Sequence, residues 1–411
     1  MEKMLTLETN AFEPRKKEIF AYDAEIIKHH QALHNGSLEM TGWVNYPMDS
    51  REDEWQRIAA TAKEIREKYT ALVVVGIGGS YLGTRSCYEL LVNQRNGVKL
   101  FFAGWNLGGY YHQRLLKKLE NYDVALCVVS KSGTTLETSL AFDLLKSYLK
   151  DRYGKNYTNR IYAVTDSTHG ALRAEAEAHG YHTFALDGNI GGRYSVLTAV
   201  GLLPLAAAGI DIFALLNGAK KAFQDFYCED IQQNQCYQYA AYRNVLFKEG
   251  KTTEFFSFAA PEMFRFGYWL KQLFAESEGK NGVGIYPSAL SYSTDLHSVG
   301  QYLEEGNPIF FETMLCLKNY AHDIAAEEHE KTYNDHIKAV TEAVYRVRNA
   351  RNTPIIRLTL EALDEEHVGY IIYFFEKACA MSCLLMGVNP FDQPGVEAYK
   401  KEMRTLLQSE K

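Results

Sequence analysis

The stretch that decides the fold is ALVVVGIGGSYLG, Ala71 to Gly83, in which five apolar residues run into a glycine-dense turn. A short, continuous run of Val and Leu is typical of a strand that helices bury on both faces. The turn precedes a helix predicted to begin near Tyr81, and such a turn presents backbone N–H groups to an anion. A buried strand followed by a glycine turn and a helix predicts a doubly wound α/β domain.

Other apolar runs of strand length recur along the first half of the chain, separated by amphipathic stretches. This alternation predicts a parallel sheet with helices between its strands. The expected strands are Leu72–Val75, Leu100–Ala103, Val124–Val129, Ile161–Thr165 and His182–Leu186. We therefore predict a first α/β domain over residues 46–190, preceded by an N-terminal helical arm over residues 1–45.

The second half repeats the alternation less clearly. A helical bridge is expected over residues 191–235, because the sequence from Val196 is apolar and helical in pattern, with Gly209 and Asp211 as the expected boundary between two helices. A second α/β domain is expected over 236–385, ending in a long helix from Asp364 to about Gly387. Its predicted strands are Thr253–Phe258, Gly284–Tyr286, Ile309–Thr313 and Ile355–Leu360. Asn389–Pro390 ends the long helix, and residues 386–411 are predicted to form a loop and a helix.

Composition narrows the class of protein. A chain of 411 residues, 46% hydrophobic and 23% charged, has the size and balance of a two-domain globular protein. No run approaches the roughly 18 apolar residues of a membrane span, and the N-terminus lacks a secretory signal, so we expect a cytoplasmic protein. The net charge of −7 argues against non-specific nucleic-acid binding.

Neither the cysteines nor the histidines have the spacing of a metal site. Seven cysteines without paired spacing predict buried free thiols rather than a disulfide framework or a zinc site. The run from His322 to His336 holds three histidines and several acids, but it lacks the i, i+4 histidine pair of HExxH. We interpret this run as a solvated polar helix and turn, and we expect no metal.

The glycine turn does not fit a nucleotide cofactor. A dinucleotide fingerprint would place a third glycine at Tyr81 and an acidic residue after the next strand, which ends in Ala103–Gly104–Trp105. A nucleotide P-loop would need Gly-Lys-Ser/Thr at this turn. What remains is a small-anion turn with Ser80 at its centre, or, alternatively, a turn whose glycines serve only tight packing.

A second turn, SKSGTTLET from Ser130 to Thr138, follows the strand DVALCVV. Four hydroxyls and a lysine gather around Gly133 just before a helix expected from Leu136. Hydroxyls and N–H groups at a helix N-terminus suit a phosphate, and helix capping alone would need only one such residue. Two anion turns at the ends of adjacent strands predict one phosphate site.

These two turns resemble the phosphosugar-binding module of sugar isomerases, and further segments narrow the likeness. Those segments are NIGGRYSVLTAVG (Asn189–Gly201), KQLFAESEGKNG from Lys271, STDLHSVGQYLEEG from Ser293 and GVNPFDQPGVEAYK (Gly387–Lys400). Together they resemble the glucose-6-phosphate isomerase family in its bacterial form, from about residue 45 to the C-terminus. The resemblance implies two doubly wound parallel-sheet domains of the SIS type, reversible glucose 6-phosphate to fructose 6-phosphate conversion, no cofactor, and a homodimer.

The resemblance also assigns roles to individual residues. The implied catalytic residues are Glu276 as the base, Arg193 as the stabiliser of the intermediate's charge, and His297 and Lys400 as the ring-opening pair. The implied phosphate-binding residues are Gly79, Ser80, Ser130, Lys131, Ser132 and Thr135, and Gln272 and Gln393 are implied to orient sugar hydroxyls. The homodimer would allow His297 to reach into the partner's pocket.

These residue types suit the chemistry of an aldose–ketose isomerisation. Ring opening needs an acid and a base, which histidine and lysine supply. A carboxylate can take the proton from carbon 2 and return it to carbon 1, and arginine offsets the enediolate charge. Neither step requires a metal or an organic cofactor.

Each assignment has a plainer alternative. Glu276 could lie in a solvated turn, His297 could be structural, Lys400 could lie on an exposed amphipathic helix, and Arg193 could pair with Asp187. Two other functions also stay open: isomerisation of another hexose phosphate such as mannose 6-phosphate, and a non-catalytic sugar-phosphate sensor. Comparing turnover on glucose 6-phosphate and mannose 6-phosphate distinguishes the first alternative. A non-catalytic sensor would have no need for the four implied catalytic residues to occur together.

Overall fold

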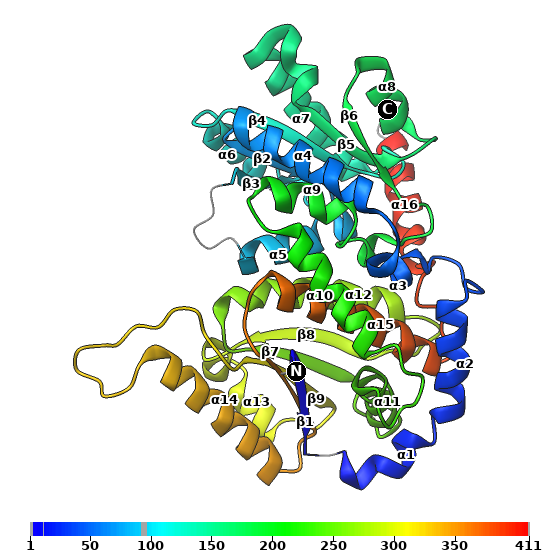
Figure 1. Ribbon diagram of the computed structural model, residues 1–411, viewed down its shortest axis with the longest axis vertical. Coiled ribbons are helices and arrows are strands. Elements are labelled where there is room, and N and C mark those ends of the chain that lie inside the picture. The colour runs from blue at the N-terminus through cyan, green and yellow to red at the C-terminus, as the bar shows by residue number, and fades with distance from the viewer. Residues whose placement is uncertain (1–2, 11, 92–96, 410–411) are drawn as a thin grey trace.

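The computed structural model describes residues 3–10, 12–91 and 97–409. Two five-stranded sheets form the upper and lower parts of the molecule, and helices lie between them (Figure 1). One sheet has the strand order β3-β2-β4-β5-β6, and the other has the order β1-β10-β9-β7-β8. The predicted α/β fold with two mainly parallel sheets is therefore confirmed.

The first sheet is parallel throughout and matches the predicted strands to within a residue or so. It comprises β2 (Ala71–Val75), β3 (Lys99–Ala103), β4 (Val124–Val129), β5 (Ile161–Asp166) and β6 (His182–Leu186). Every residue of β2 and β4 is buried, as expected for strands with helices on both faces. The accompanying helices are α4 (Glu52–Lys68), α5 (Leu82–Leu91), α6 (Gly109–Leu119), α7 (Leu136–Tyr153) and α8 (Ala171–His179).

The order of the strands creates a crevice between β2 and β4. Leu72 and Val74 of β2 pack with α5, whereas Val73 and Val75 pack with α6 and α7, so the helices after β2 and β4 leave on opposite faces. In open α/β sheets, ligands bind at the carboxyl ends of strands where the order reverses in this way. The two predicted anion turns follow these two strands directly.

The second sheet adds an antiparallel strand to four parallel ones. Its parallel strands are β7 (Thr253–Phe258), β8 (Tyr286–Ser291), β9 (Phe310–Leu317) and β10 (Ile355–Leu360). The edge strand β1 (Leu5–Thr9) pairs antiparallel with β10. The prediction of a wholly helical arm over residues 1–45 is therefore wrong at its start, because Leu5 is buried on this sheet. The rest of the arm holds α1 (Lys16–Phe20), α2 (Asp23–His34) and α3 (Gly42–Asn45).

Two predicted strands of the second sheet are displaced. The strand expected at Gly284–Tyr286 begins only at Tyr286, because Gly284 has a φ of 124° and belongs to the turn before the strand. The strand expected at Ile309–Thr313 runs from Phe310 to Leu317 and is buried along its whole length. The boundaries of the five predicted domains stay a prediction.

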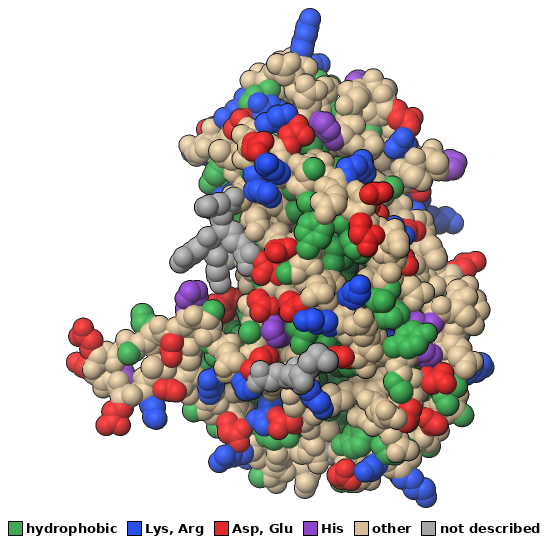
Figure 2. All heavy atoms as spheres, viewed as in Figure 1, with side chains coloured by type: hydrophobic (Ala, Val, Ile, Leu, Met, Phe, Trp, Pro, Cys, Tyr) green, Lys and Arg blue, Asp and Glu red, His purple; other side chains and the backbone are tan. Residues whose placement is uncertain are grey.

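Helices join and cover the second sheet. They are α9 (Ala199–Ala207), α10 (Ile212–Asp225), α11 (Gln235–Lys248), α12 (Phe264–Glu278), α13 (Gly300–Glu305), α14 (Tyr333–Ala350), α15 (Glu365–Leu385) and α16 (Gly395–Ser409). In Figure 1, α10, α12 and α15 lie between the two sheets, and α16 runs up beside the first. The segment before α14 projects from the molecule, and Figure 2 shows acidic side chains toward its end.

The helix α15 forms the centre of the core. It is long and apolar enough to cross a membrane, but 94% of its apolar window is buried inside the protein. Its aromatic residues Tyr373, Phe374 and Phe375 are fully buried against α10, α11 and α12. Its apolar character therefore reflects its place in the protein interior, where it packs against α12.

Candidate active site

The second anion turn is shaped by its own hydroxyls. The Oγ of buried Ser130 accepts a hydrogen bond from the Gly133 N–H at 3.0 Å, and the Oγ of Ser132 accepts one from the Thr134 N–H at 3.1 Å. Thr135 occupies the N-cap position of α7, but its side chain makes no capping hydrogen bond. The hydroxyls therefore organise the turn, and the N-terminus of α7 keeps backbone donors for an anion.

Both turns use glycine where no other residue fits. A Cβ on Gly79 would lie 2.1 Å from the carbonyl carbon of Gly192, so the first turn rests directly on the segment that carries Arg193. Gly133 has a φ of 75°, and a Cβ there would lie 2.3 Å from the backbone nitrogen of Leu172. The alternative interpretation, in which the glycines serve tight packing, is thus correct for Gly79. This packing places the turn against the backbone of Gly192 and Arg193.

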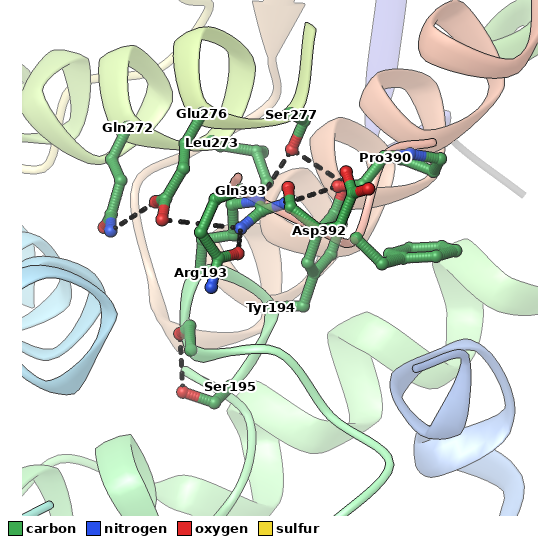
Figure 3. Close-up of polar contacts among 12 residues, drawn as sticks. Arg193, Tyr194, Ser195, Gln272, Leu273, Glu276, Ser277, Pro390, Asp392 and Gln393 are labelled. Carbon is green, nitrogen blue, oxygen red and sulfur yellow. Dashed lines mark hydrogen bonds and ion pairs between the residues drawn. The ribbon is translucent and has the colours of Figure 1, made fainter. Parts of the chain in front are cut away.

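Arg193 lies in the short turn Gly192–Tyr194 and is 3% exposed. Its Nε donates to the Oγ of Ser277 at 2.8 Å, and its Nη1 donates to the Oε1 of Gln393 at 2.9 Å. Its Nη2 donates to the backbone carbonyls of Pro390 at 2.5 Å and Asp392 at 3.1 Å. Figure 3 shows this guanidinium between α12 and the loop after α15. The alternative pairing with Asp187 does not occur, because Asp187 binds Arg51.

Glu276 projects from the last turn of α12 toward the arginine (Figure 3). Its Oε1 lies 3.5 Å from the Nη1 of Arg193, and its Oε2 accepts a hydrogen bond from the Nε2 of Gln272 at 2.8 Å. Gln272 and Glu276 are four residues apart, which puts both on one face of the helix. A buried arginine and a carboxylate with 26% exposure thus form the centre of the site.

Two buried aromatic residues, Tyr194 and Trp269, support the position of Arg193. Tyr194 is fully buried, and burial raises the pKa of its hydroxyl well above the usual value, so it remains a neutral group 3.3 Å from the Ser277 Oγ. The indole N–H of Trp269 donates to the Arg193 carbonyl at 3.3 Å. Sequence patterns gave no sign of these supports, although Ser277 stands next to Glu276 in the motif AESEGK.

A buried charge network anchors the end of α12 that carries Glu276. Arg243 of α11 forms ion pairs with Glu254 of β7, at 2.8 Å, and with Glu278, both fully buried. The backbone N–H of Ile285, just before β8, donates to the Glu278 carboxylate at 3.2 Å. Breaking a buried pair of this kind costs several kcal/mol, so the network holds the last turn of α12 in place.

Two of the predicted catalytic residues do not reach this centre. His297 ends the turn Thr294–His297 after β8 and is exposed. Lys400 lies on α16, where its Nζ pairs with Glu397 at 2.8 Å. In the part of the chain that the structure describes, no hydrogen bond or ion pair joins either residue to Arg193 or Glu276. The alternative interpretation, in which Lys400 lies on an amphipathic helix, agrees with this i, i+3 ion pair.

The predicted phosphate-binding residues gather at the two turns. Ser80 ends the short helix Gly78–Ser80 after β2, and Ser130, Ser132 and Thr135 line the turn after β4. Lys131 is exposed, and its Nζ donates to the Gly188 carbonyl at 3.2 Å. Within residues 3–10, 12–91 and 97–409, no group of three or more His, Cys, Asp or Glu side chains is placed to hold a metal ion.

Comparison with solved structures identifies the fold. A glucose-6-phosphate isomerase from Chlamydia trachomatis superposes with a TM-score of 0.85 at 20% identity, covering 99% of this chain and 89% of the other. A hypothetical protein from Thermus thermophilus superposes with a TM-score of 0.90 at 27% identity, covering 98% and 100%. The fold is that of the SIS-type phosphosugar isomerases.

Sequence comparisons identify the family within this class. The family model for phosphoglucose isomerase matches residues 45–315. The glucose-6-phosphate isomerase of Alkaliphilus metalliredigens is 44% identical over 402 residues, covering 92% of this chain and 89% of the relative. That of Clostridium tetani is 40% identical over 432 residues, covering 99% and 96%. The chain belongs to the phosphoglucose isomerase family, and the resemblance predicted from its motifs is confirmed.

Proposed function

We propose that this protein interconverts D-glucose 6-phosphate and D-fructose 6-phosphate, with Glu276 moving the proton between carbons 1 and 2. The observation that carries the proposal is the Glu276–Arg193 pair, 3.5 Å apart, next to the glycine turn after β2, where a Cβ on Gly78 would lie 3.1 Å from the Gln272 Nε2. An open-chain sugar phosphate held by its phosphate at the turns places its first carbons at this pair. The proposal includes a cytoplasmic location.

The hydrogen bonds of Glu276 suit a base that must give its proton back. Gln272 holds Oε2 in place, which leaves Oε1 as the oxygen that approaches the substrate. Because α12 is anchored behind Glu276 by the Arg243 network, the carboxylate keeps its position through both proton transfers. One oxygen can therefore serve both carbons of the enediol.

Arg193 is suited to stabilise the enediolate. A guanidinium has five N–H donors, and four are used by Ser277, Gln393, Pro390 and Asp392. The fifth lies on Nη1, the nitrogen that faces Glu276. A fixed donor with full positive charge next to the base stabilises an oxyanion that forms there, without reorganisation during the reaction.

Gln272 offers a place for a substrate hydroxyl. Its Nε2 is used by Glu276, but its Oε1 is buried and has no hydrogen-bond partner among the described residues. A buried acceptor without a partner costs about 1–3 kcal/mol. A sugar hydroxyl that donates to this oxygen would remove that cost, so the substrate completes the hydrogen bonding of the site.

The proposal gives His297, one of the two ring-opening residues, a role in a second copy of the chain. Glu278, two residues after Glu276, accepts a hydrogen bond from Ile285 just before β8, whereas His297 follows the other end of that strand. Six residues of strand span about 17–20 Å. His297 of one chain is therefore proposed to serve the site of its partner in a homodimer, where it would assist Lys400 in opening the sugar ring.

Mixing two inactive variants tests this arrangement. Glu276→Gln and His297→Ala proteins are unfolded and refolded together, which allows mixed dimers to form. If His297 acts across the dimer, each mixed dimer regains one intact site, and activity returns to about 25% of the parent's at equal amounts. A mixture as inactive as its components, with mixed dimers verified by mass spectrometry, would contradict the assignment.

A coupled assay with the purified protein tests the reaction itself. We expect turnover of glucose 6-phosphate to fructose 6-phosphate, with mannose 6-phosphate used far more slowly. In D₂O, the product should carry deuterium at the carbon that receives the proton, because a carboxylate exchanges its proton with solvent in some turnovers. Product free of deuterium after many turnovers would indicate hydride transfer and refute the enediol route.

A further inference from the structure

Lys280 is a buried lysine next to the site to which neither the motifs nor the proposed mechanism gives a role. It follows α12 by two residues, and its side chain is 8% exposed. Its Nζ lies 2.7 Å from the Ser277 carbonyl, 2.5 Å from the Asn389 carbonyl and 3.1 Å from an Asp392 carboxylate oxygen. An ammonium group has three N–H donors, and all three have an acceptor here.

These acceptors come from two segments that are far apart in the sequence. Ser277 belongs to the last turn of α12, while Asn389 and Asp392 belong to the loop between α15 and α16. Lys280 therefore ties the helix that carries the base to the loop after α15. Figure 3 shows these two segments on either side of the Arg193 guanidinium.

The same loop supplies most of the hydrogen bonds that orient Arg193. The Pro390 and Asp392 carbonyls accept from Nη2, and Gln393 accepts from Nη1. The Lys280 acceptor Asn389 and the Arg193 acceptor Pro390 are consecutive residues. Moving the loop away from α12 would therefore remove the acceptors of the arginine.

The backbone around Lys280 is itself constrained. Asn281 and Gly282 have φ values of 53° and 76°, and the Val283 N–H donates to the Lys280 carbonyl at 2.9 Å. Two consecutive positive φ values with Asn-Gly at the centre are typical of a type I′ turn. This turn fixes the lysine directly after the helix, so that its ammonium group meets the loop without a large loss of freedom.

We propose that Lys280 is a positioning residue for Arg193: it holds the Asn389–Gln393 loop against α12 and so keeps the guanidinium in place for the enediolate. This role rests on the proposed function. Lys280 touches neither the turns that bind phosphate nor the carboxylate of Glu276. Its loss should therefore reduce catalysis of the proton transfer while leaving phosphate binding intact.

The test compares Lys280→Met with the parent by steady-state kinetics at 25 °C. We expect kcat to fall by about thirty- to a hundredfold, because the charged hydrogen bonds that join the Asn389–Gln393 loop to the end of α12 are lost. The KM for fructose 6-phosphate should change less than about threefold, since uniform substrate binding is not altered. A parent protein without isomerase activity would refute the proposed function rather than the role of Lys280.

Binding of two inhibitors separates positioning from general damage. A five-carbon aldonate phosphate carries a carboxylate where the enediolate forms, and glucitol 6-phosphate has the same phosphate without that charge. The variant should lose affinity for the aldonate phosphate about as much as it loses kcat/KM. Its affinity for glucitol 6-phosphate should stay within threefold of the parent's. Equal losses for both inhibitors would overturn the proposal.

Lys251→Met is a matched control. Lys251, just before β7, also ties a separate loop, through the Pro308 carbonyl at 2.5 Å, but among the described residues no hydrogen bond or ion pair joins it to the Asn389–Gln393 loop. We expect parent-like kcat from this variant. If Lys280→Met does not fold, Lys280→Gln, which keeps two N–H donors, should show a smaller loss with the same difference between the inhibitors. Parent-like kinetics in a folded Lys280 variant would refute the role.

Discussion

Replacing Arg193 by lysine keeps its charge but removes its geometry. The guanidinium makes four hydrogen bonds from three nitrogens, to Ser277, Gln393 and two carbonyls of the loop after α15. A lysine has one nitrogen and cannot reach all of these acceptors. Hydrogen bonds from charged groups contribute about 1.5–3 kcal/mol each. Losing one or two of them should lower the free energy of unfolding by about 1.5–6 kcal/mol.

The effect of Arg193→Lys on catalysis should exceed its effect on binding. Removing a fixed donor from a developing oxyanion lowers kcat by about 10²- to 10³-fold. We expect a loss of this size in a coupled assay at 25 °C, with KM changed by less than about fivefold, because the phosphate turns stay intact. Urea unfolding at the same temperature verifies that the variant is folded. A folded variant with kcat within about fivefold of the parent would refute the account of Arg193.

Other predictions concern packing and burial. Gly79→Ala should lower the free energy of unfolding by about 2 kcal/mol or more and kcat/KM by over tenfold, because the added Cβ would meet the Gly192 backbone. The control is Gly109→Ala, whose Cβ would meet no atom within 4 Å and which should unfold thermally like the parent. Glu376 is buried, and its Oε1 has no hydrogen-bond partner among the residues that the structure describes. Burial, followed by the proximity of Cys379, raises the pKa of its carboxyl well above 4.5. The folded state therefore loses stability as pH rises above the unfolded pKa of about 4.5. Glu376→Gln should become more stable relative to the parent between pH 5.5 and pH 8.5 in urea unfolding, and a pH-independent difference would contradict this.

The first sheet could be predicted from the sequence because each of its strands is a local feature. The runs around Leu72, Leu100 and Val124 are continuous, apolar and bounded by turns, so periodicity alone identifies them. The strand β1 could not be found in this way. Its residues are held by pairing with β10, some 350 positions away, and a local pattern does not record such a partner.

The residues of the candidate site could be predicted where they belong to a recognisable sequence motif. Arg193, Glu276, Gln272 and Gln393 were identified from the motifs, and the structure brings them together. The carbonyls of Pro390 and Asp392 could not be predicted, because backbone acceptors leave no side-chain signal in a sequence. His297 belongs to the same family motifs, but the single chain holds it at the far end of β8, so the proposed role of this residue needs a partner chain that one sequence does not describe.

The central claim is that the carboxylate of Glu276 transfers the proton, and Glu276→Gln tests it most directly. The amide keeps the shape of the side chain and can still accept from Gln272, but it cannot take up a proton at neutral pH. The account predicts that the coupled assay will show kcat reduced by at least about a thousandfold, with binding of glucitol 6-phosphate unchanged. A variant that converts glucose 6-phosphate at close to the parent rate would contradict it.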